Sequence, residues 1–197
     1  KQLSKVKNYR EGVIAQFFYV GAQTVCWAYI VYYGHHVFHD LDGMADKAAD
    51  QLTTRFYLTA LALFAIGRFV FTGFLKFVKP GKLLSVISIG AIVLLCGVIF
   101  ADGKAGLCCL VAVSGCMSLM FPTIYGIALN GLKENVKFGS AGLIMSILGG
   151  SVIPPIQAAI MDVKGDVLGL SSMNFSFFVP FICFAVIAIY GFRSLKN

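Results

Sequence analysis

Long apolar stretches separated by short polar turns dominate the chain. Six of them lie at residues 11–36, 52–78, 82–101, 105–131, 138–161 and 174–192. Each approaches or exceeds the roughly 20 apolar residues that a helix needs to cross about 30 Å of hydrocarbon. Because a backbone in lipid must satisfy its own hydrogen bonds, each stretch is predicted to be helical. The pattern therefore predicts an all-α membrane protein with six transmembrane helices.

Composition supports this class and argues against a soluble domain. Of the 197 residues, 58% are hydrophobic and 13% charged, whereas charged residues make up about 25% of a typical soluble domain. The sequence contains no P-loop, no Ser/His/Asp constellation and no carboxylate pair within a span. We therefore expect no enzymatic activity, no bound cofactor and no resident metal. The six cysteines all fall in apolar stretches, where a free thiol behaves as a small hydrophobe: Cys26, Cys96, Cys108, Cys109, Cys116 and Cys183.

Basic residues alternate between the two sets of span ends. One set carries Lys1, Lys5, Lys7, Arg10, Lys76, Lys79, Lys82, Lys133, Lys137, Arg193 and Lys196. The other set has Lys47, Arg55, Lys104 and Lys164, together with Asp40, Asp42, Asp46, Asp50, Asp102, Asp162 and Asp166. The positive-inside rule then places both termini in the cytoplasm. Because the net charge of +7 is spread over separate turns, we expect membrane lipid as a partner and no nucleic acid.

A polar stripe runs along the first predicted helix. Gln16, Tyr19, Gln23 and Trp27 recur at three- and four-residue steps, which places them on one helical face. In a water-filled cavity, amides bond a substrate's hydroxyl groups and aromatic rings stack on its C–H surface. This chemistry suits a sugar. The alternative, that the amides bond neighbouring helices and serve packing, stays open.

Arg68 is the charge that lies deepest within a span. An intramembrane Arg is costly, so it is usually paired or faces water. One interpretation is a cytoplasmic-side gate in which helix carbonyls or Glu134 hold Arg68. The alternative is that its long side chain extends to the lipid headgroups.

Two later spans contain helix-breaking residues. Pro122 is predicted to bend the fourth span and to leave Tyr125 or Asn130 facing an aqueous path. In the fifth span, glycines allow close helix approach and prolines free backbone carbonyls, so this helix is predicted to bend or pivot near its middle. Gln157 lies in the same span, with a path-lining and a packing role both open. The gating residues expected here are Gly149, Gly150, Pro154 and Pro155, in addition to Arg68.

A histidine-rich segment follows the first span, with His35, His36, His39, Asp40 and Asp42. Since it lacks four-ligand spacing with cysteines, a solvated loop accounts for it better than a metal site. The spans contain no mid-membrane Asp or Glu, the residues expected to carry protons through a proton-driven transporter. Proton coupling, if present, must therefore depend on residues elsewhere.

Several motifs resemble the fucose/galactose/glucose:proton symporters of the major facilitator superfamily. The segment from Gly67 and Arg68 to Lys76 also resembles the short basic signature of that superfamily, although the usual Asp of that signature is missing. The resemblance covers essentially the whole chain, and its first motif is the most specific. The motifs are REGVIAQFFYVGAQ at residues 10–23, IGRF at 66–69, FPTI at 121–124 and KFGS at 137–140, with Gly149 and Gly150 following.

The resemblance implies a particular domain organisation. The family has twelve spans in two halves, and this sequence resembles the second half, so residues 1–197 would form the C-terminal six-helix bundle. The start at Lys1 fits this expectation of a piece of a longer chain. The N-terminal half would supply the proton-carrying carboxylates and much of the sugar site. This half would supply the opposing wall through Gln16, Tyr19, Gln23, Trp27, Tyr125 and Asn130.

The function implied is proton-coupled sugar symport by alternating access in a bacterial inner membrane, with the proton as coupling ion. L-Fucose is the leading substrate, with galactose, glucose or an amino sugar close behind, since a few hydrogen bonds decide between them. Two alternatives are a major facilitator exporter of non-sugar solutes and a non-transporting six-span membrane protein.

Overall fold

The computed structural model describes residues 6–101, 103–132, 135–163 and 169–195. Eight residues discussed above lie outside this described part: Lys1, Lys5, Asp102, Lys133, Glu134, Lys164, Asp166 and Lys196.

Six helical segments of the described chain are long and apolar enough to cross a membrane, which confirms the predicted fold class. They are Lys7–Leu41, Asp46–Phe74, Pro80–Phe100, Lys104–Leu129, Val136–Met161 and Ser172–Ser194. The first segment continues past its predicted end at residue 36 through one π-helical stretch. The second begins at Asp46 instead of at residue 52, in keeping with the favourable interaction of an acidic side chain with a helix N-terminus.

Most of these segments are interrupted, so the helices outnumber the spans. The elements in chain order are α1 (Lys7–His35), η2 (His36–Leu41), α2 (Asp46–Phe74), α3 (Pro80–Phe100), α4 (Lys104–Met117), α5 (Met120–Leu129), α6 (Val136–Met145), η4 (Ser146–Leu148), α7 (Gly149–Met161), α8 (Ser172–Ser176) and α9 (Phe178–Ser194). The fourth span breaks at Ser118 and Leu119, just before Pro122, which has no N–H to donate to the Ser118 carbonyl. In the fifth span, the α-helix is interrupted by one 3₁₀ turn at Ser146–Leu148, directly before Gly149.

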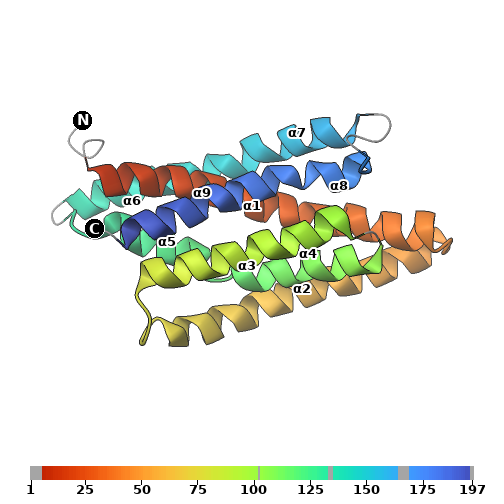
Figure 1. Ribbon diagram of the computed structural model, residues 1–197, viewed down its shortest axis with the longest axis horizontal. Coiled ribbons are helices and arrows are strands. Elements are labelled where there is room, and N and C mark those ends of the chain that lie inside the picture. Colours follow the sequence, from red (N-terminus) through yellow and green to blue (C-terminus); the bar gives the residue numbers. More distant parts are fainter. Residues whose placement is uncertain (1–5, 102, 133–134, 164–168, 196–197) are drawn as a thin grey trace.

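The helices lie side by side along the long axis of the bundle (Figure 1). The start of α1 and the end of α9 lie at one end, together with the α2–α3 turn, the end of α5 and the start of α6. We call this the terminal end, and the other the far end. The α1–α2 connection, the end of α3, the start of α4, the end of α7 and the start of α8 lie at the far end (Figure 1). Among the described residues, the basic and acidic sets of turns identified in the sequence therefore separate onto opposite ends.

Helix α1 occupies the centre of the bundle and contacts α2, α4, α5, α7 and α9. The two helices that flank it, α2 and α7, are much less buried. Among the 29 residues of α2, the buried ones are Ala49, Thr53, Ala60 and Gly67, and α7 buries Gly149, Ile153 and Gln157. The exposed apolar surfaces of α2 and α7 need lipid or another protein surface to cover them.

Candidate functional site

The predicted stripe on α1 is divided by its surroundings. Gln16 and Tyr19 are fully buried, at 0% exposure, whereas Gln23 and Trp27 are half-buried. Helical spacing does place the four residues on one side of α1. Other helices cover that side over the first turns of α1 and leave it partly open farther along. The open part is therefore the segment with Gln23 and Trp27.

The covering helices can be identified from close contacts. Near the terminal end, Gly12 packs so tightly against Ala128 of α5 and the Tyr190 hydroxyl of α9 that a Cβ there would meet both. The Tyr9 hydroxyl donates a hydrogen bond to the Gly139 carbonyl of α6 over 3.1 Å. The first part of α1 is thus enclosed by three helices, and both polar atoms of the Gln16 amide are buried without a partner in the described chain.

Trp27 joins α1 to α2 at the open part of the stripe. Its ring meets Phe64 edge to face, with ring centroids 5.0 Å apart and planes at 79°, an arrangement that aromatic quadrupoles favour. Its indole Nε1 is buried and has no partner within the described residues. Sequence reasoning missed Phe64, although its position one helical turn before Arg68 places both on the same side of α2.

Arg68 is exposed on α2, next to a close helix contact. A Cβ on the preceding residue, Gly67, would lie 2.8 Å from the Ser118 hydroxyl, so α2 packs directly on the break between α4 and α5. Arg68 therefore lies beside the contact between α2 and the helix break. Its suggested partner Glu134 is outside the described residues.

Tyr125 follows the break on α5 and is half-buried. Its ring stacks on Phe121, with centroids 6.3 Å apart and planes at 12°. Phe121 in turn meets the ring of Tyr19 at 6.1 Å and 68°. Phe121, which sequence reasoning did not single out, thus connects two residues predicted for the site.

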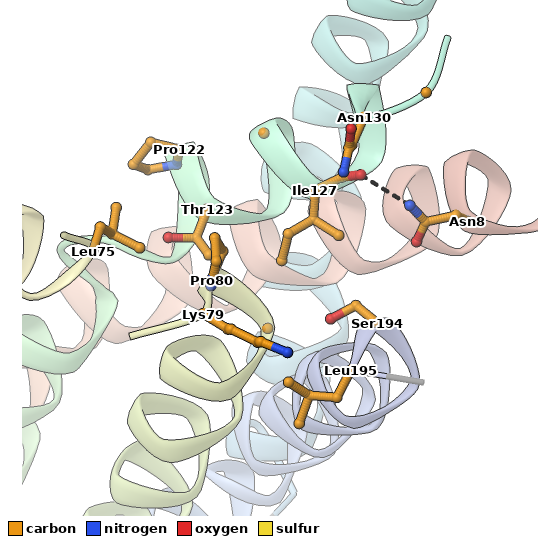
Figure 2. A pocket seen from close by; sticks show the side chains of 13 residues that line it. Asn8, Leu75, Lys79, Pro80, Pro122, Thr123, Ile127, Asn130, Ser194 and Leu195 are labelled. Atoms are coloured by element: carbon orange, nitrogen blue, oxygen red, sulfur yellow. Dashed lines mark hydrogen bonds between the residues drawn. The ribbon is translucent and has the colours of Figure 1, made fainter. Parts of the chain in front are cut away.

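Asn130 lies apart from these residues, in a cavity at the terminal end (Figure 2). This open cavity of about 630 Å³ is lined by the starts of α1 and α3, by α5 and by the end of α9. Figure 2 shows Lys79 extending toward Ser194, and Asn8 donating from Nδ2 to the Ile127 carbonyl over 2.9 Å. Neither Tyr125 nor the residues of the α1 stripe line it. No signal in the sequence indicates that Asn8, Lys79 and Ser194 line one cavity, because they come from three separate span ends.

Gly149 and Gly150 form a close crossing between α7 and α1. A Cβ at Gly149 would overlap the Phe17 carbonyl, and one at Gly150 would lie 2.9 Å from the Thr24 hydroxyl. Gly21 of α1 makes the matching approach to Ile153. Pro154 and Pro155 lie inside α7, half-buried and exposed respectively.

Gln157 of α7 is fully buried, and its Nε2 donates to the Ser176 hydroxyl over 3.2 Å. In the described structure it serves packing between α7 and α8.

Ion pairs account for the histidine-rich segment at the far end. His36 Nδ1 lies 2.7 Å from Asp40, and His39 Nδ1 lies 2.8 Å from the same carboxylate. His39 Nε2 lies 3.0 Å from Asp46 at the start of α2. Asp42 pairs with Lys104 at the start of α4 over 2.9 Å. These pairs connect the end of the first span to the two neighbouring helices.

The chain is similar to sugar transporters over nearly its whole length. It is 50% identical over 195 residues to the L-fucose-proton symporter of Haemophilus influenzae. This alignment covers 99% of this chain and 43% of that protein. It is 30% identical over 186 residues to the glucose/galactose transporter of Brucella abortus, covering 94% of this chain and 42% of that protein. No family model matches the chain. The chain spans less than half the length of these relatives.

A solved structure supports the same relationship. The crystal structure of FucP, a major facilitator superfamily transporter in the outward conformation, matches with a TM-score of 0.84 and 31% identity over 98% of this chain and 43% of that one. The chain is thus a multi-pass membrane protein with the fold of one six-helix half of a major facilitator superfamily transporter. Its named relatives are transporters and not enzymes, and they confirm the resemblance to the fucose/galactose/glucose:proton symporters.

Proposed function

We propose that this chain is the C-terminal half of a proton-coupled symporter for L-fucose or a related hexose. The similarity to an L-fucose-proton symporter, at 50% identity over 99% of the chain, is the observation that carries the proposal. The transporter works by alternating access, in which two bundles rock about a substrate site near the middle of the bilayer. It lies in the bacterial inner membrane with the terminal end, which carries most of the Lys and Arg, in the cytoplasm.

The cleft wall on this half is the open part of α1 between α2 and α7. The Gln23 amide offers hydrogen bonds to sugar hydroxyls, and the exposed part of the Trp27 ring offers an apolar face. The proposal is supported by the half-buried state of both side chains. Tyr125, half-buried on α5, contributes a hydroxyl to the same wall.

Three other predicted residues fit direct contact with the sugar less well. Gln16 and Tyr19 are enclosed by the bundle, so in this conformation a sugar cannot reach them. Asn130 lines the separate cavity at the terminal end, which suits a place on the cytoplasmic exit path better than one in the central wall. We therefore assign the central contact to Gln23, Trp27 and Tyr125.

The other half of the transporter supplies the proton carrier in this proposal. The two carboxylates of the sequence nearest the basic span ends are Glu11 and Glu134, and Glu11 pairs with Arg193 over 2.9 Å. The aspartates lie at the far end or in the outer turns. A carboxylate that changes protonation during transport must face the cleft near mid-membrane, a position that none of the described carboxylates occupies.

The gate is assigned to Arg68 and to the α1–α7 crossing. Arg68 stands beside the helix break, where backbone carbonyls can accept from its guanidinium. The contacts of Gly149 and Gly150 with α1 leave no space for side chains, so α7 can pivot on α1 without separating from it. Pro154 and Pro155 cannot donate to the carbonyls of Gly150 and Ser151, so the flexible point of α7 is the turn that precedes these prolines.

Uptake of radiolabelled L-fucose by cells that express the full-length protein tests the proposal. We expect uptake that is driven by a proton gradient, accompanied by alkalinisation of the medium, and reduced by an excess of galactose or glucose in proportion to their affinity. Uptake of fucose without alkalinisation of the medium would contradict the proposed proton coupling. If none of the three sugars is taken up, the chain belongs to a transporter of other solutes or to a non-transporting protein.

A further inference from the structure

The break in the fourth span is stabilised from another helix. In an unbroken helix the Met117 carbonyl would accept from the N–H four residues later. Here the chain turns at Ser118 and Leu119, and the Tyr19 hydroxyl of α1 donates to the Met117 carbonyl over 2.9 Å. This bond is buried and joins residues 98 positions apart. Its loss would leave a buried carbonyl without its side-chain donor, which is costly in an apolar interior.

Side-chain bonds on either side of the break are local by comparison. The Ser118 hydroxyl donates to the Gly115 carbonyl over 2.7 Å, and the Thr123 hydroxyl donates to the Leu119 carbonyl over 2.8 Å. Each of these bonds stays within one turn of its own helix. They stabilise the ends of α4 and α5 but do not fix the direction of one helix relative to the rest of the bundle. The bond from Tyr19 does so, because its donor belongs to the central helix.

The Tyr19 ring continues the connection into α5. It meets Phe121 edge to face at 6.1 Å, and Phe121 stacks on Tyr125 at 6.3 Å. Tyr19 is fully buried, so its position is fixed by packing on all sides. A shift of the α4–α5 angle would therefore move Phe121 against Tyr19 and carry Tyr125 with it.

We infer that Tyr19 is a positioning residue, which holds the α4–α5 break through its hydroxyl and thereby places Tyr125 for the sugar. This inference rests on the proposed function and assigns to Tyr19 an indirect role, acting through Tyr125.

A double-mutant cycle in the full-length transporter tests the inference, with L-fucose as the probe. Binding is measured by calorimetry for the unsubstituted protein, Tyr19→Phe, Tyr125→Ala and the double variant. We expect Tyr19→Phe to raise the Kd about fivefold when Tyr125 is present and to have little effect in the Tyr125→Ala background. The matched control is Tyr33→Phe, because the buried Tyr33 hydroxyl also donates to a backbone carbonyl, that of Ala101. This control should leave the Kd unchanged.

Phe121→Leu provides a second variant that interrupts the same connection without touching Tyr19, and it should show the same dependence on Tyr125. Equal fold-changes from Tyr19→Phe with and without Tyr125, or a lower thermal midpoint with unchanged Kd, would overturn the inference and leave the proposed function standing. Absence of binding of fucose, galactose and glucose by the unsubstituted protein would overturn the proposed function, and the inference with it.

Discussion

The two parts of α1 carry similar side chains in different surroundings. Residues 7–19 contain Gln16 and Tyr19, both enclosed by the bundle, while residues 20–35 contain Gln23 and Trp27, both half-buried. One amide and one aromatic residue are thus covered by other helices in the first part, and an equivalent pair is half-buried in the second. The comparison shows that a polar stripe identifies a helix face, but the neighbouring helices decide which part of that face is accessible.

The crossing at Gly149 separates the two parts, and disrupting it should have the largest effect. Gly149→Val would drive a branched side chain into the Phe17 backbone, so we expect a loss of about 3 kcal/mol of stability and little transport. The measurement is thermal unfolding of the purified full-length protein. Gly73→Ala is the matched control, because nothing lies within 4 Å of a Cβ at that helical glycine. A thermal midpoint for Gly149→Val equal to that of the control would contradict the close crossing.

The open part of α1 should respond in sugar binding. Trp27→Ala and Gln23→Ala are each expected to raise the Kd for L-fucose about tenfold, equivalent to about 1.4 kcal/mol, because they remove contacts made to the sugar. Ile30→Ala, at a fully buried apolar position of the same helix, should affect stability more than affinity. The Kd of each variant is measured by calorimetry, which distinguishes a loss of sugar contacts from a loss of stability. Small and equal changes in all three would favour a packing role for the stripe.

Arg68 tests whether the region beside the break moves during transport. We expect Arg68→Ala to lower the maximal transport rate severalfold while folding is largely retained, since the side chain is exposed and its removal leaves no cavity. Arg68→Lys, which keeps the charge and loses the planar fork, should recover part of the rate. Transport kinetics in proteoliposomes provide the measurement. Unchanged kinetics in Arg68→Ala would refute the gate.

The enclosed part of α1 should respond in stability and not in sugar binding. Gln16→Leu replaces a buried amide that has no partner in the described chain by an apolar side chain of similar size. We therefore expect stability to stay the same or to rise by about 1 kcal/mol, because the desolvation cost of an unpaired amide is removed. The Kd for fucose should not change. A clear loss of affinity in equilibrium binding would place Gln16 in the sugar site.

The sequence was sufficient for the fold class because hydrophobicity over about 20 residues is a strong and local signal. It also identified the break near Pro122, since proline lacks an N–H wherever it occurs. The burial of Tyr19 depends on which helices lie next to one another. That arrangement joins residues far apart in the chain, such as Tyr19 and Met117, and leaves no pattern in either local segment.

Cysteine accessibility tests the central claim most directly. In a full-length protein whose native cysteines have been replaced, single cysteines are introduced as Gln23→Cys and Gln16→Cys and exposed to a membrane-impermeant thiol reagent. We predict that the cysteine at residue 23 reacts and that L-fucose slows its reaction, whereas the cysteine at residue 16 stays unreactive. Equal reactivity at the two positions, or reactivity at residue 23 that fucose leaves unchanged, would contradict a sugar-binding cleft along the open part of α1.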